Sequence, residues 1–297
     1  MLTRPMLAED ADESRVRFPV IAQPKIDGVR GCNLDGTLTT RRLKPHGNRH
    51  TLVRFSQPCY QGYDGEFATT ARTHPDLCRL TTSAIGTHAG EPPMMWHVFD
   101  LINDDTISLT YAERYDALQA KVFMECPVDV EIVPSVLIHT PEALLDWDSQ
   151  WLEMGYEGTI LRDPDGKYKQ GRSTVREGGL LRIKRFIEED AIVLELVEGE
   201  ENGNEAQVNE LGRTFRSSHA AGKTPNGMLG AMICRDVKTG KRMTVGSGAM
   251  PHRDREMYLA RPELLIGQTI KYKHFPRGVK NLPRFPTFVA LRLVGDI

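Results

Sequence analysis

The sequence has few cysteines, and their spacing gives no pattern for zinc binding or disulfide pairing. Its five cysteines are scattered along 297 residues, and none belongs to a C-x-x-C pair. Structural zinc sites and small disulfide-rich secreted domains both need closely spaced cysteines, so the sequence excludes both classes. An odd number of isolated cysteines is typical of the reducing cytosol. We therefore expect a cytoplasmic protein.

Long apolar segments are missing as well. No run of 18 apolar residues occurs, and the N-terminal segment 1–17 is polar and contains several acidic residues. A membrane-spanning helix and a secretory signal peptide both need an apolar stretch, so we expect no membrane partner. With 40% hydrophobic and 26% charged residues, the composition is that of a globular protein with one large domain or two ordinary ones.

An excess of charge of one sign is also missing, since the formal net charge is −2. Basic residues are instead concentrated locally. Six of them and no acidic residue lie in 271–292, and eight lie in 162–185 against three acidic residues. Such stretches are typical of a surface that binds a polyanion. They are also typical of ordinary solvated faces, and charge alone does not separate the two interpretations.

Hydrophobic periodicity predicts a mixed α/β domain in the first part of the chain. Tyr111, Tyr115 and Leu118 recur at helical spacing and predict a helix that ends at residue 125. A second helix is expected from 140 to 155, where a threonine–proline pair forms a typical helix start. The strands expected here are 18–22, 29–34, 37–41, 60–67, 94–102, 158–162 and 180–186, with an Asp-Gly turn joining the second to the third.

Short β-type segments dominate after residue 187. The strands expected there are 191–197, 228–235, 242–245, 268–274 and 287–294, with one short helix at 253–260. About five strands in about 110 residues are typical of an OB-fold. The polar, glycine-rich segment 199–226 predicts a long loop or a partly ordered insertion. The predicted domains are thus 1–187 and 188–297, and a cleft between two such domains is a natural ligand site.

One lysine follows the first predicted strand of the chain. Lys25 stands in the segment Pro24–Arg30 (PKIDGVR), where Asp27 and Gly28 would turn the chain and project the lysine into a pocket. A lysine amine is a good nucleophile only when neutral, a state favoured by desolvation or by neighbouring cations. Alone, the segment is equally consistent with an ordinary surface turn.

Further segments follow this lysine in a characteristic order. They are Thr40–Asn48 (TRRLKPHGN), Asp64–Phe67 (DGEF), Trp96–Asp100 (WHVFD), Glu157-Gly158, Leu180–Lys184 (LLRIK) and Arg284–Arg292 (RFPTFVALR). In order and spacing they resemble the motifs of the covalent nucleotidyltransferase superfamily, which includes ATP-dependent DNA ligases, RNA ligases and mRNA capping enzymes. Two positions depart from the family pattern: Thr40 stands for serine, and Arg182 stands for lysine.

The resemblance implies a fold and a reaction. The fold is an α+β nucleotidyltransferase (adenylation) domain with mixed and antiparallel sheets, followed by an all-β OB-fold domain. The reaction begins when Lys25 attacks the α-phosphate of ATP and becomes lysyl-AMP. AMP then passes to the 5′-phosphate of a nicked duplex DNA, and attack by the 3′-hydroxyl seals the nick. Splitting one difficult condensation into such transfers is the usual advantage of covalent catalysis.

The resemblance also implies the role of each motif residue. Lys25, Asp27 and Lys184 form the catalytic set, and Glu66 and Glu157 hold Mg²⁺ or Mn²⁺ through hard oxygen ligands. The remaining motif residues bind the nucleotide. Around the base, Phe99 stacks on adenine, Gln23 lies near the adenine amino group, and Ile26 lines the site. Arg30 and Arg41 contact ribose or phosphate. The α-phosphate is contacted by Arg182 and Lys184, and the pyrophosphate by Arg284 and Arg292.

Two assignments keep alternatives. Arg42 competes with Arg41 for the same role, and Asp100 is a candidate outer-shell metal ligand or partner of Lys25. The two C-terminal arginines reach ATP only if the OB domain closes by a hinge motion near 187–190.

Within this resemblance, the position of Lys25 near the start of the chain implies a minimal two-domain ligase of the phage or bacterial type, in the bacterial cytoplasm or in that of the phage's host. We expect it to act as a monomer and to hold duplex DNA with its own surface. Contacts to phosphates with strong salt dependence are then expected. The candidate DNA-contacting residues are Lys44, Asn48, Arg213, Arg216, Lys223, Lys271 and Lys273. An RNA ligase or a capping-type nucleotidyltransferase is the nearer alternative function, although the Arg-x-Pro-x-Phe pattern at 284–288 favours a DNA ligase. A non-enzymatic OB-fold protein that binds nucleic acid is the more distant one.

Overall fold

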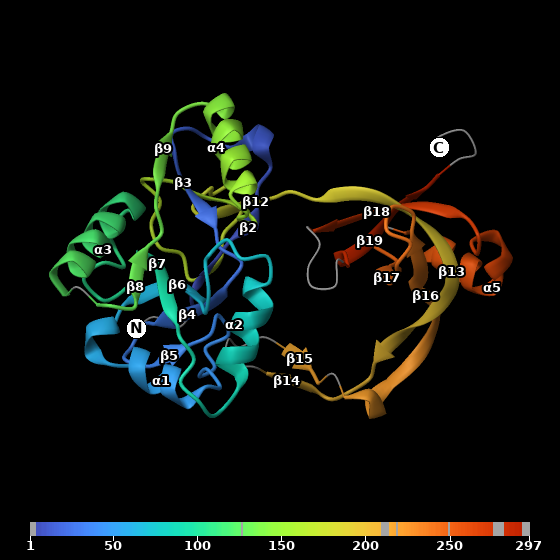
Figure 1. Cartoon of the computed structure of the whole chain (residues 1–297), viewed down its shortest axis with the longest axis horizontal. Coiled ribbons are helices and arrows are strands. Elements are labelled where there is room, and N and C mark those ends of the chain that lie inside the picture. The colour runs from blue at the N-terminus through green and yellow to red at the C-terminus, as the bar shows by residue number, and fades with distance from the viewer. Residues whose placement is uncertain are drawn as a thin grey trace. The chain divides into compact units, whose positions relative to one another are not determined.

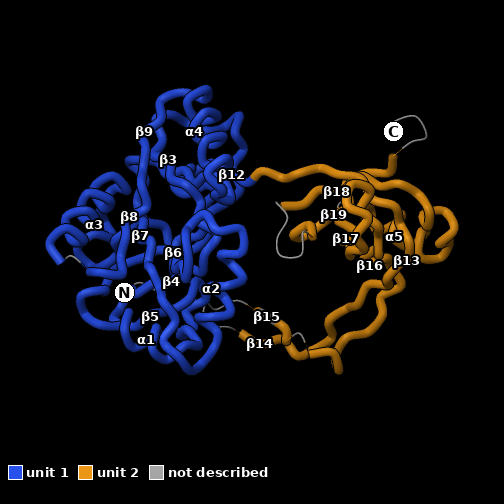
Figure 2. Tube along the Cα trace, viewed as in Figure 1, with its two compact units in different colours: residues 1–184 blue, residues 185–297 orange. Residues whose placement is uncertain are grey.

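The computed structural model describes residues 4–125, 127–208, 214–217, 219–248, 250–275 and 282–292. The chain forms two compact units, Met1–Lys184 and Arg185–Ile297, coloured separately in Figure 2. The division lies close to the boundary expected after residue 187. Among the described residues, no helix is long and apolar enough to cross a membrane.

Unit 1 is built on two five-stranded sheets (Figure 1). The order in the first sheet is β2 (Glu9–Asp10), β12 (Leu181–Lys184), β10 (Gly158–Arg162), β3 (Val20–Lys25) and β9 (Val136–Ile138). The order in the second sheet is β5 (Leu38–Thr39), β4 (Val29–Asn33), β6 (Tyr63–Ala68), β7 (Met95–Leu101) and β8 (Val130–Ile132). Most neighbours are antiparallel, while β2–β12 and β7–β8 run parallel, so both sheets are mixed.

The helices of unit 1 are α1 (Arg49–Phe55), α2 (Leu77–Gly86), α3 (Tyr111–Glu125) and α4 (Pro141–Glu153). The structure confirms the predicted α3 and α4, and the Thr140 side chain caps α4 by accepting from the Ala143 amide. Helices α1 and α2 were not predicted. Helix α1 has only 7 residues, too few for a clear period. Helix α2 buries Leu77, Thr81 and Ile85, a four-residue spacing that a polar residue interrupts.

Two apolar clusters hold unit 1 together. In the first, Trp96 stacks on Phe67 with ring centroids 4.8 Å apart and meets Phe55 edge to face. In the second, Trp151 of α4 belongs to the same buried cluster as Ala22 of β3. Because neighbouring side chains on a strand point to opposite faces, Ala22 packs into this core while Gln23 points to the opposite face of the sheet.

The polar segment expected to lead into the first strand is paired. Strand β1 (Met6–Leu7) runs parallel to β11 (Gly171–Arg172), and β2 extends the first sheet beside β12. A strand of two residues is too short to show alternation, so its pairing is not visible in the sequence.

Unit 2 is a closed five-stranded barrel with strand order β13 (Ile187–Asn202), β16 (Lys223–Asp236), β17 (Arg242–Gly246), β19 (Arg284–Leu291) and β18 (Thr269–Phe275). Val193, Met232 and Tyr272 are fully buried in its core. Helix α5 (His252–Ala260) packs on β16. The predicted all-β OB-type domain and its short helix are confirmed.

For 199–226 the sequence leaves open a long loop or a partly ordered insertion, and the described part of that segment is an insertion with strands of its own rather than a loop. Strands β13 and β16 continue beyond the barrel as a ladder that pairs Glu200 with Pro225 and Asn202 with Lys223. We call this extension, the described residues of 199–226, the arm. A small antiparallel pair, β14 (Ala206–Val208) and β15 (Thr214–Arg216), lies at its end (Figure 1). The arm is mostly polar and exposed on both faces, so its strands lack the alternation that identifies half-buried strands.

Candidate active site

The register of the first sheet aligns the motif residues in two rows. Lys25 of β3 lies opposite Gly158 of β10, which lies opposite Lys184 of β12. Gln23 and Arg182 form the neighbouring row, with Ile160 between them. Residues directly opposite each other in antiparallel strands share a face of the sheet. Two segments far apart in the sequence therefore present their lysines side by side.

Glu157 joins the two lysines. Its carboxylate accepts a hydrogen bond from Lys25 Nζ through Oε2, and Lys184 Nζ lies 2.5 Å from Oε1. The side chains are largely sheltered, with exposures of 18% for Lys25 and 9% for Glu157. Burial alone would raise the pKa of Glu157, but the two ammonium groups hold it at about 2. A permanent carboxylate thus fixes both amines.

Two glycines permit this close approach. A Cβ on Gly158 would stand 2.2 Å from the carbonyl oxygen of Ile183, and its φ of +152° disfavours any other residue. A Cβ on Gly28 would stand 2.4 Å from the carbonyl oxygen of Phe67. The glycines of the Lys25 and Glu157 motifs are therefore required by backbone packing around the site.

The second sheet contributes Glu66, which lies opposite Arg30 on the adjacent strand. Burial is the main cause that raises the pKa of Glu66 to about 7. The positive charges of Lys25 and Arg30 lower this pKa in part, whereas the negative charges of Asp64 and Glu157 raise it further. A Cβ on Gly28 would stand 3.3 Å from the Cβ of Glu66, so the segment that follows Lys25 packs against Glu66. The two sheets thus bring the nucleophile candidate and both acidic candidates together.

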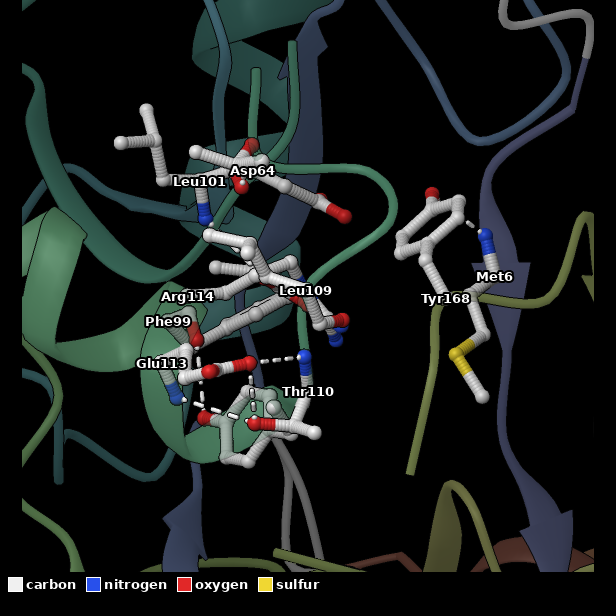
Figure 3. Close-up of polar contacts among 12 residues, drawn as sticks. Met6, Asp64, Phe99, Leu101, Leu109, Thr110, Glu113, Arg114 and Tyr168 are labelled. Atoms are coloured by element: carbon white, nitrogen blue, oxygen red, sulfur yellow. Dashed lines mark hydrogen bonds and ion pairs between the residues drawn. The ribbon is translucent and has the colours of Figure 1, made fainter. Parts of the chain in front are cut away.

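Arg30 is held by neighbours within unit 1. Its Nε and Nη2 donate to the Asp64 carboxylate at 2.8 and 2.5 Å, and its Nη1 donates to the Met6 carbonyl at 2.7 Å. Met6 in turn donates its amide hydrogen to the Tyr168 hydroxyl at 2.8 Å, and Figure 3 shows these two residues beside each other. The guanidinium also lies 5.5 Å from the centroid of the Phe99 ring. Strand β1 therefore helps to orient Arg30.

Asp100 has a different environment from the one expected. Its carboxylate accepts from Arg114 Nε at 2.8 Å and from Arg162 Nη1 at 3.1 Å, and all three side chains are buried. Figure 3 shows Arg114 beside Phe99 and Leu109. The expectation that Asp100 serves a metal or Lys25 is replaced by an arginine–aspartate–arginine cluster. Sequence reasoning missed Arg162, although it lies on the same face of β10 as Gly158, four positions along the strand.

The remaining nucleotide candidates of the strands and turns of unit 1 differ in exposure. Gln23 is 1% exposed, and its Nε2 has no partner among the described residues. The side chain of Ile26 packs in the second core cluster, away from the site that it was expected to line. Phe99 is half-buried against that cluster. Arg182 Nε donates to Asp10 Oδ1 at 2.6 Å, and this contact holds the pKa of Asp10 below its usual value.

The segment after β5 carries four candidates in two environments. Arg41, Arg42 and Lys44 are exposed on the turn that follows the strand. Asn48 is fully buried as the cap of α1: its oxygen accepts from the Thr51 amide at 2.8 Å, and its nitrogen donates to the Thr87 carbonyl at 2.9 Å. The structure therefore commits Asn48 to capping a helix rather than to contacting DNA.

Unit 2 carries its candidate residues on strand surfaces. Lys271 and Lys273 alternate with the buried Tyr272 and His274 along β18. Lys271 forms an ion pair with Glu188, and Nζ of Lys273 lies 4.9 Å from the ring centroid of Phe186. In the arm, Lys223 pairs with Glu200 at 3.4 Å, and Arg216 donates to the Asn204 carbonyl. Arg292 Nε donates to Asp190 Oδ1 at 2.9 Å, and Arg284 is half-buried. Arg213 lies outside the described residues.

Comparison with protein families identifies the family to which this chain belongs. Residues 5–184 match the family model described as ATP dependent DNA ligase domain, and residues 222–292 match the one described as DNA ligase OB-like domain. The chain belongs to the ATP-dependent DNA ligase family. The two matches fall in the two units, and the catalytic and OB-like order agrees with the predicted fold class.

Individual relatives carry the same family name. The chain is 26% identical over 240 residues to a probable DNA ligase of Mycolicibacterium paratuberculosis, covering 77% of this chain and 43% of that protein. It is 24% identical over 278 residues to a DNA ligase of Haemophilus influenzae, covering 90% of this chain and 85% of that protein. The chain thus spans less than half the length of the mycobacterial relative.

Solved ligase structures share the architecture. The adenylated DNA ligase of Chlorella virus is 27% identical, with a TM-score of 0.55 and coverage of 98% of this chain and 100% of that one. A Lig E DNA ligase gives a TM-score of 0.74 at 19% identity, with the same coverage. The second likeness concerns the fold alone.

The acidic residues of this ligase-family site fit a divalent cation of the Mg²⁺ type. No cluster of three or more His, Cys, Asp or Glu side chains suited to a metal occurs among the described residues. Mg²⁺ is commonly bound through one or two carboxylates, with phosphate oxygens and water completing the shell. Glu66 and Glu157 could supply those carboxylates.

Proposed function

We propose that the chain is an ATP-dependent DNA ligase that seals nicks in duplex DNA through a lysyl-AMP intermediate on Lys25. The observation that carries the proposal is the convergence of Lys25 and Lys184, from separate strands, on the carboxylate of Glu157. Glu66 packs against the segment that follows Lys25. A catalytic lysine beside a second cation and paired carboxylates suits attack on a phosphate. The family membership supports the same chemistry.

In the first step, the neutral amine of Lys25 attacks the α-phosphorus of ATP. The new N–P bond forms as the P–O bond to pyrophosphate breaks, and the ammonium proton passes to solvent beforehand. Glu157 keeps the amines of Lys25 and Lys184 on one side of the site, so the nucleophile is aligned before the nucleotide arrives.

Two transfers follow. A 5′-phosphate oxygen of the nick attacks the AMP phosphorus, the N–P bond breaks, and Lys25 recovers its amine. The 3′-hydroxyl then attacks the activated 5′-phosphate, forms the phosphodiester and releases AMP. Lys184 and Arg182 are positioned to neutralise charge at the transferred phosphate, and alignment with charge neutralisation is the main source of rate in such reactions. Glu66 and Glu157 would hold Mg²⁺ or Mn²⁺, which supplies further neutralisation of phosphate charge.

Unit 2 supplies the remaining contacts in this proposal. Arg284 and Arg292 bind the pyrophosphate of ATP when a hinge near 187–190 closes the OB-type unit over the nucleotide. The duplex is held as a monomeric complex through phosphate contacts from Lys44, Arg213, Arg216, Lys223, Lys271 and Lys273. Several of these side chains already have acidic or carbonyl partners, which DNA phosphates would have to replace.

The decisive experiment is the intact mass of the protein after incubation with ATP and Mg²⁺. The expected result is a gain of one AMP that is absent from Lys25→Ala, followed by sealing of a nicked DNA duplex. A GMP adduct from GTP, or sealing of nicked RNA in preference to DNA, would support the capping-type or RNA-ligase alternative instead. No adduct with ATP under any metal condition would reject the proposal.

A further inference from the structure

Two buried nitrogen donors on one face of neighbouring strands have no partner among the described residues. They are Nε2 of Gln23 on β3 and Nε of Arg162 on β10, in side chains that are 1% and 2% exposed. Gln23 lies opposite Ile160, and Arg162 is the next residue on that face of β10. Buried donors nearly always have an acceptor, because leaving one unpaired is costly. The pair therefore points to an acceptor that the described part of the chain does not provide.

Arg162 is held rigidly without using this nitrogen. Its Nη1 donates to Asp100 at 3.1 Å, and its guanidinium carbon lies 4.4 Å from the ring centroid of Tyr111 and 5.4 Å from that of Phe99. Arg114 binds the same carboxylate, but all three of its nitrogens donate to the protein. Its Nε and Nη2 donate to Asp100, and its Nη1 donates to the Leu109 carbonyl at 2.9 Å. Only one arginine of this cluster thus has an unpaired Nε.

The location of Arg162 is the end of the site away from the phosphate. Arg162 lies opposite Ile21, four residues before Lys25, which is about 13 Å along β3 at the usual rise per residue. Gln23 lies between these two ends on β3, and the half-buried Phe99 ring lies beside the Arg162 guanidinium. An aromatic face beside unpaired donors is the chemistry that holds a flat heterocycle.

We propose that Arg162 is a specificity residue for the nucleotide base: its guanidinium donates to a purine ring nitrogen that flanks the exocyclic amino group. The Gln23 amide accepts from that amino group through Oε1 and donates through Nε2 to the ring nitrogen on its other side. The inference rests on the proposed function, since it assumes that the site holds ATP. Adenine offers a ring acceptor on each side of its amino group, N1 and N7. A donor fixed at N1 disfavours guanine, which carries a hydrogen there, whereas a donor at N7 accepts both purines.

The test measures the rate of Lys25 adenylation with ATP, 1-deaza-ATP and 7-deaza-ATP in the wild type, Arg162→Lys and Arg114→Lys. Replacing the contacted nitrogen by C–H should slow the wild type about ten- to a hundredfold, the usual effect of losing a hydrogen bond to a charged donor. In Arg162→Lys this penalty should fall below about threefold, because the donor is gone. Arg114→Lys is the matched control: it disturbs the same Asp100 cluster and should keep the full penalty.

Each outcome decides the matter. A penalty for one analogue that disappears only in Arg162→Lys supports the inference, and the analogue concerned identifies N1 or N7. Equal rates for all three nucleotides in the wild type, or a penalty unchanged in Arg162→Lys, overturn it. If Arg162→Lys does not fold, Gln23→Leu replaces it: persistence of the penalty supports Arg162, and its loss assigns the contact to Gln23. Absence of any adduct with ATP would instead reject the proposed function.

Discussion

The two units hold their charged residues in different ways. In unit 1, Lys25, Lys184 and Glu157 are 9–21% exposed and converge from separate strands. In unit 2, the pair Lys223–Glu200 is 33% and 56% exposed on a two-stranded arm. Sheltered pairs are preorganised and little affected by salt, whereas exposed pairs contribute little energy and are easily exchanged. We infer that unit 1 performs the chemistry and that unit 2 supplies adjustable contacts to the substrate.

The largest expected effect is at Lys25. Lys25→Arg keeps a positive charge beside Glu157, but a guanidinium stays protonated and cannot act as the nucleophile. We expect no measurable AMP adduct by mass, a loss of at least about 10⁴-fold. Sealing of a nick that already carries 5′-AMP should survive, because that step does not need the amine as nucleophile. An adduct on Lys25→Arg would contradict the assignment.

A matched pair of substitutions tests the difference between the units directly. Glu157→Gln removes the charge that holds two ammonium groups, and should reduce the adenylation rate about 10²–10³-fold. Glu200→Gln makes the same change at the exposed pair with Lys223 and should leave that rate unchanged within about twofold. Single-turnover adenylation with ATP measures both. Similar losses in the two variants would mean that the chemistry is not confined to unit 1.

The next effect concerns DNA binding by the arm. Changing Arg213, Arg216 and Lys223 together to alanine should weaken binding to a nicked duplex and leave adenylation intact. If each residue contacts one phosphate, the slope of log affinity against log salt should fall by about 2–3. Lys238→Ala is the control, since Lys238 is 75% exposed in unit 2 but lies outside the arm. Parallel losses in binding and adenylation would reject this division of roles.

The sequence predicts the elements in which buried apolar residues recur at regular spacing. Helices α3 and α4 and the barrel strands were predicted because one side of each packs on a core. It does not predict the strands of the arm, whose residues are polar on both faces, or the two-residue strands β1 and β2. Such elements are set by pairing with a distant strand, which single-sequence periodicity does not record.

For the site, motif order indicated which residues matter but not how they are paired. The contacts of Glu157 with two lysines and of Arg182 with Asp10 depend on strand register. Asn48 shows the opposite error, because its position in a motif suggested a DNA contact whereas helix α1 needed a cap. Arg162 was missed because its role depends on Asp100, 62 residues away in the sequence.

The smallest expected effect is a pH dependence of stability confined to unit 1. Burial lowers the pKa of His46 to about 4, and its ring lies against Phe67 at 6.0 Å. In the unfolded chain histidine titrates at about 6.5, so the unfolded state binds more protons between these values and stability falls as pH falls through that window. The loss from His46 should reach about 2 kcal/mol between pH 6.5 and 5.

Denaturant unfolding can isolate this contribution, because the tryptophans at 96, 147 and 151 all lie in unit 1 and their fluorescence reports that unit alone. His46→Gln should reduce the slope of unfolding free energy against pH in this window. The slope should not vanish, since burial also lowers the pKa of His97 to about 4. An unchanged slope in the variant would mean that His46 reaches solvent in the native state, and that the sheltering attributed to unit 1 does not extend to this edge of its second sheet.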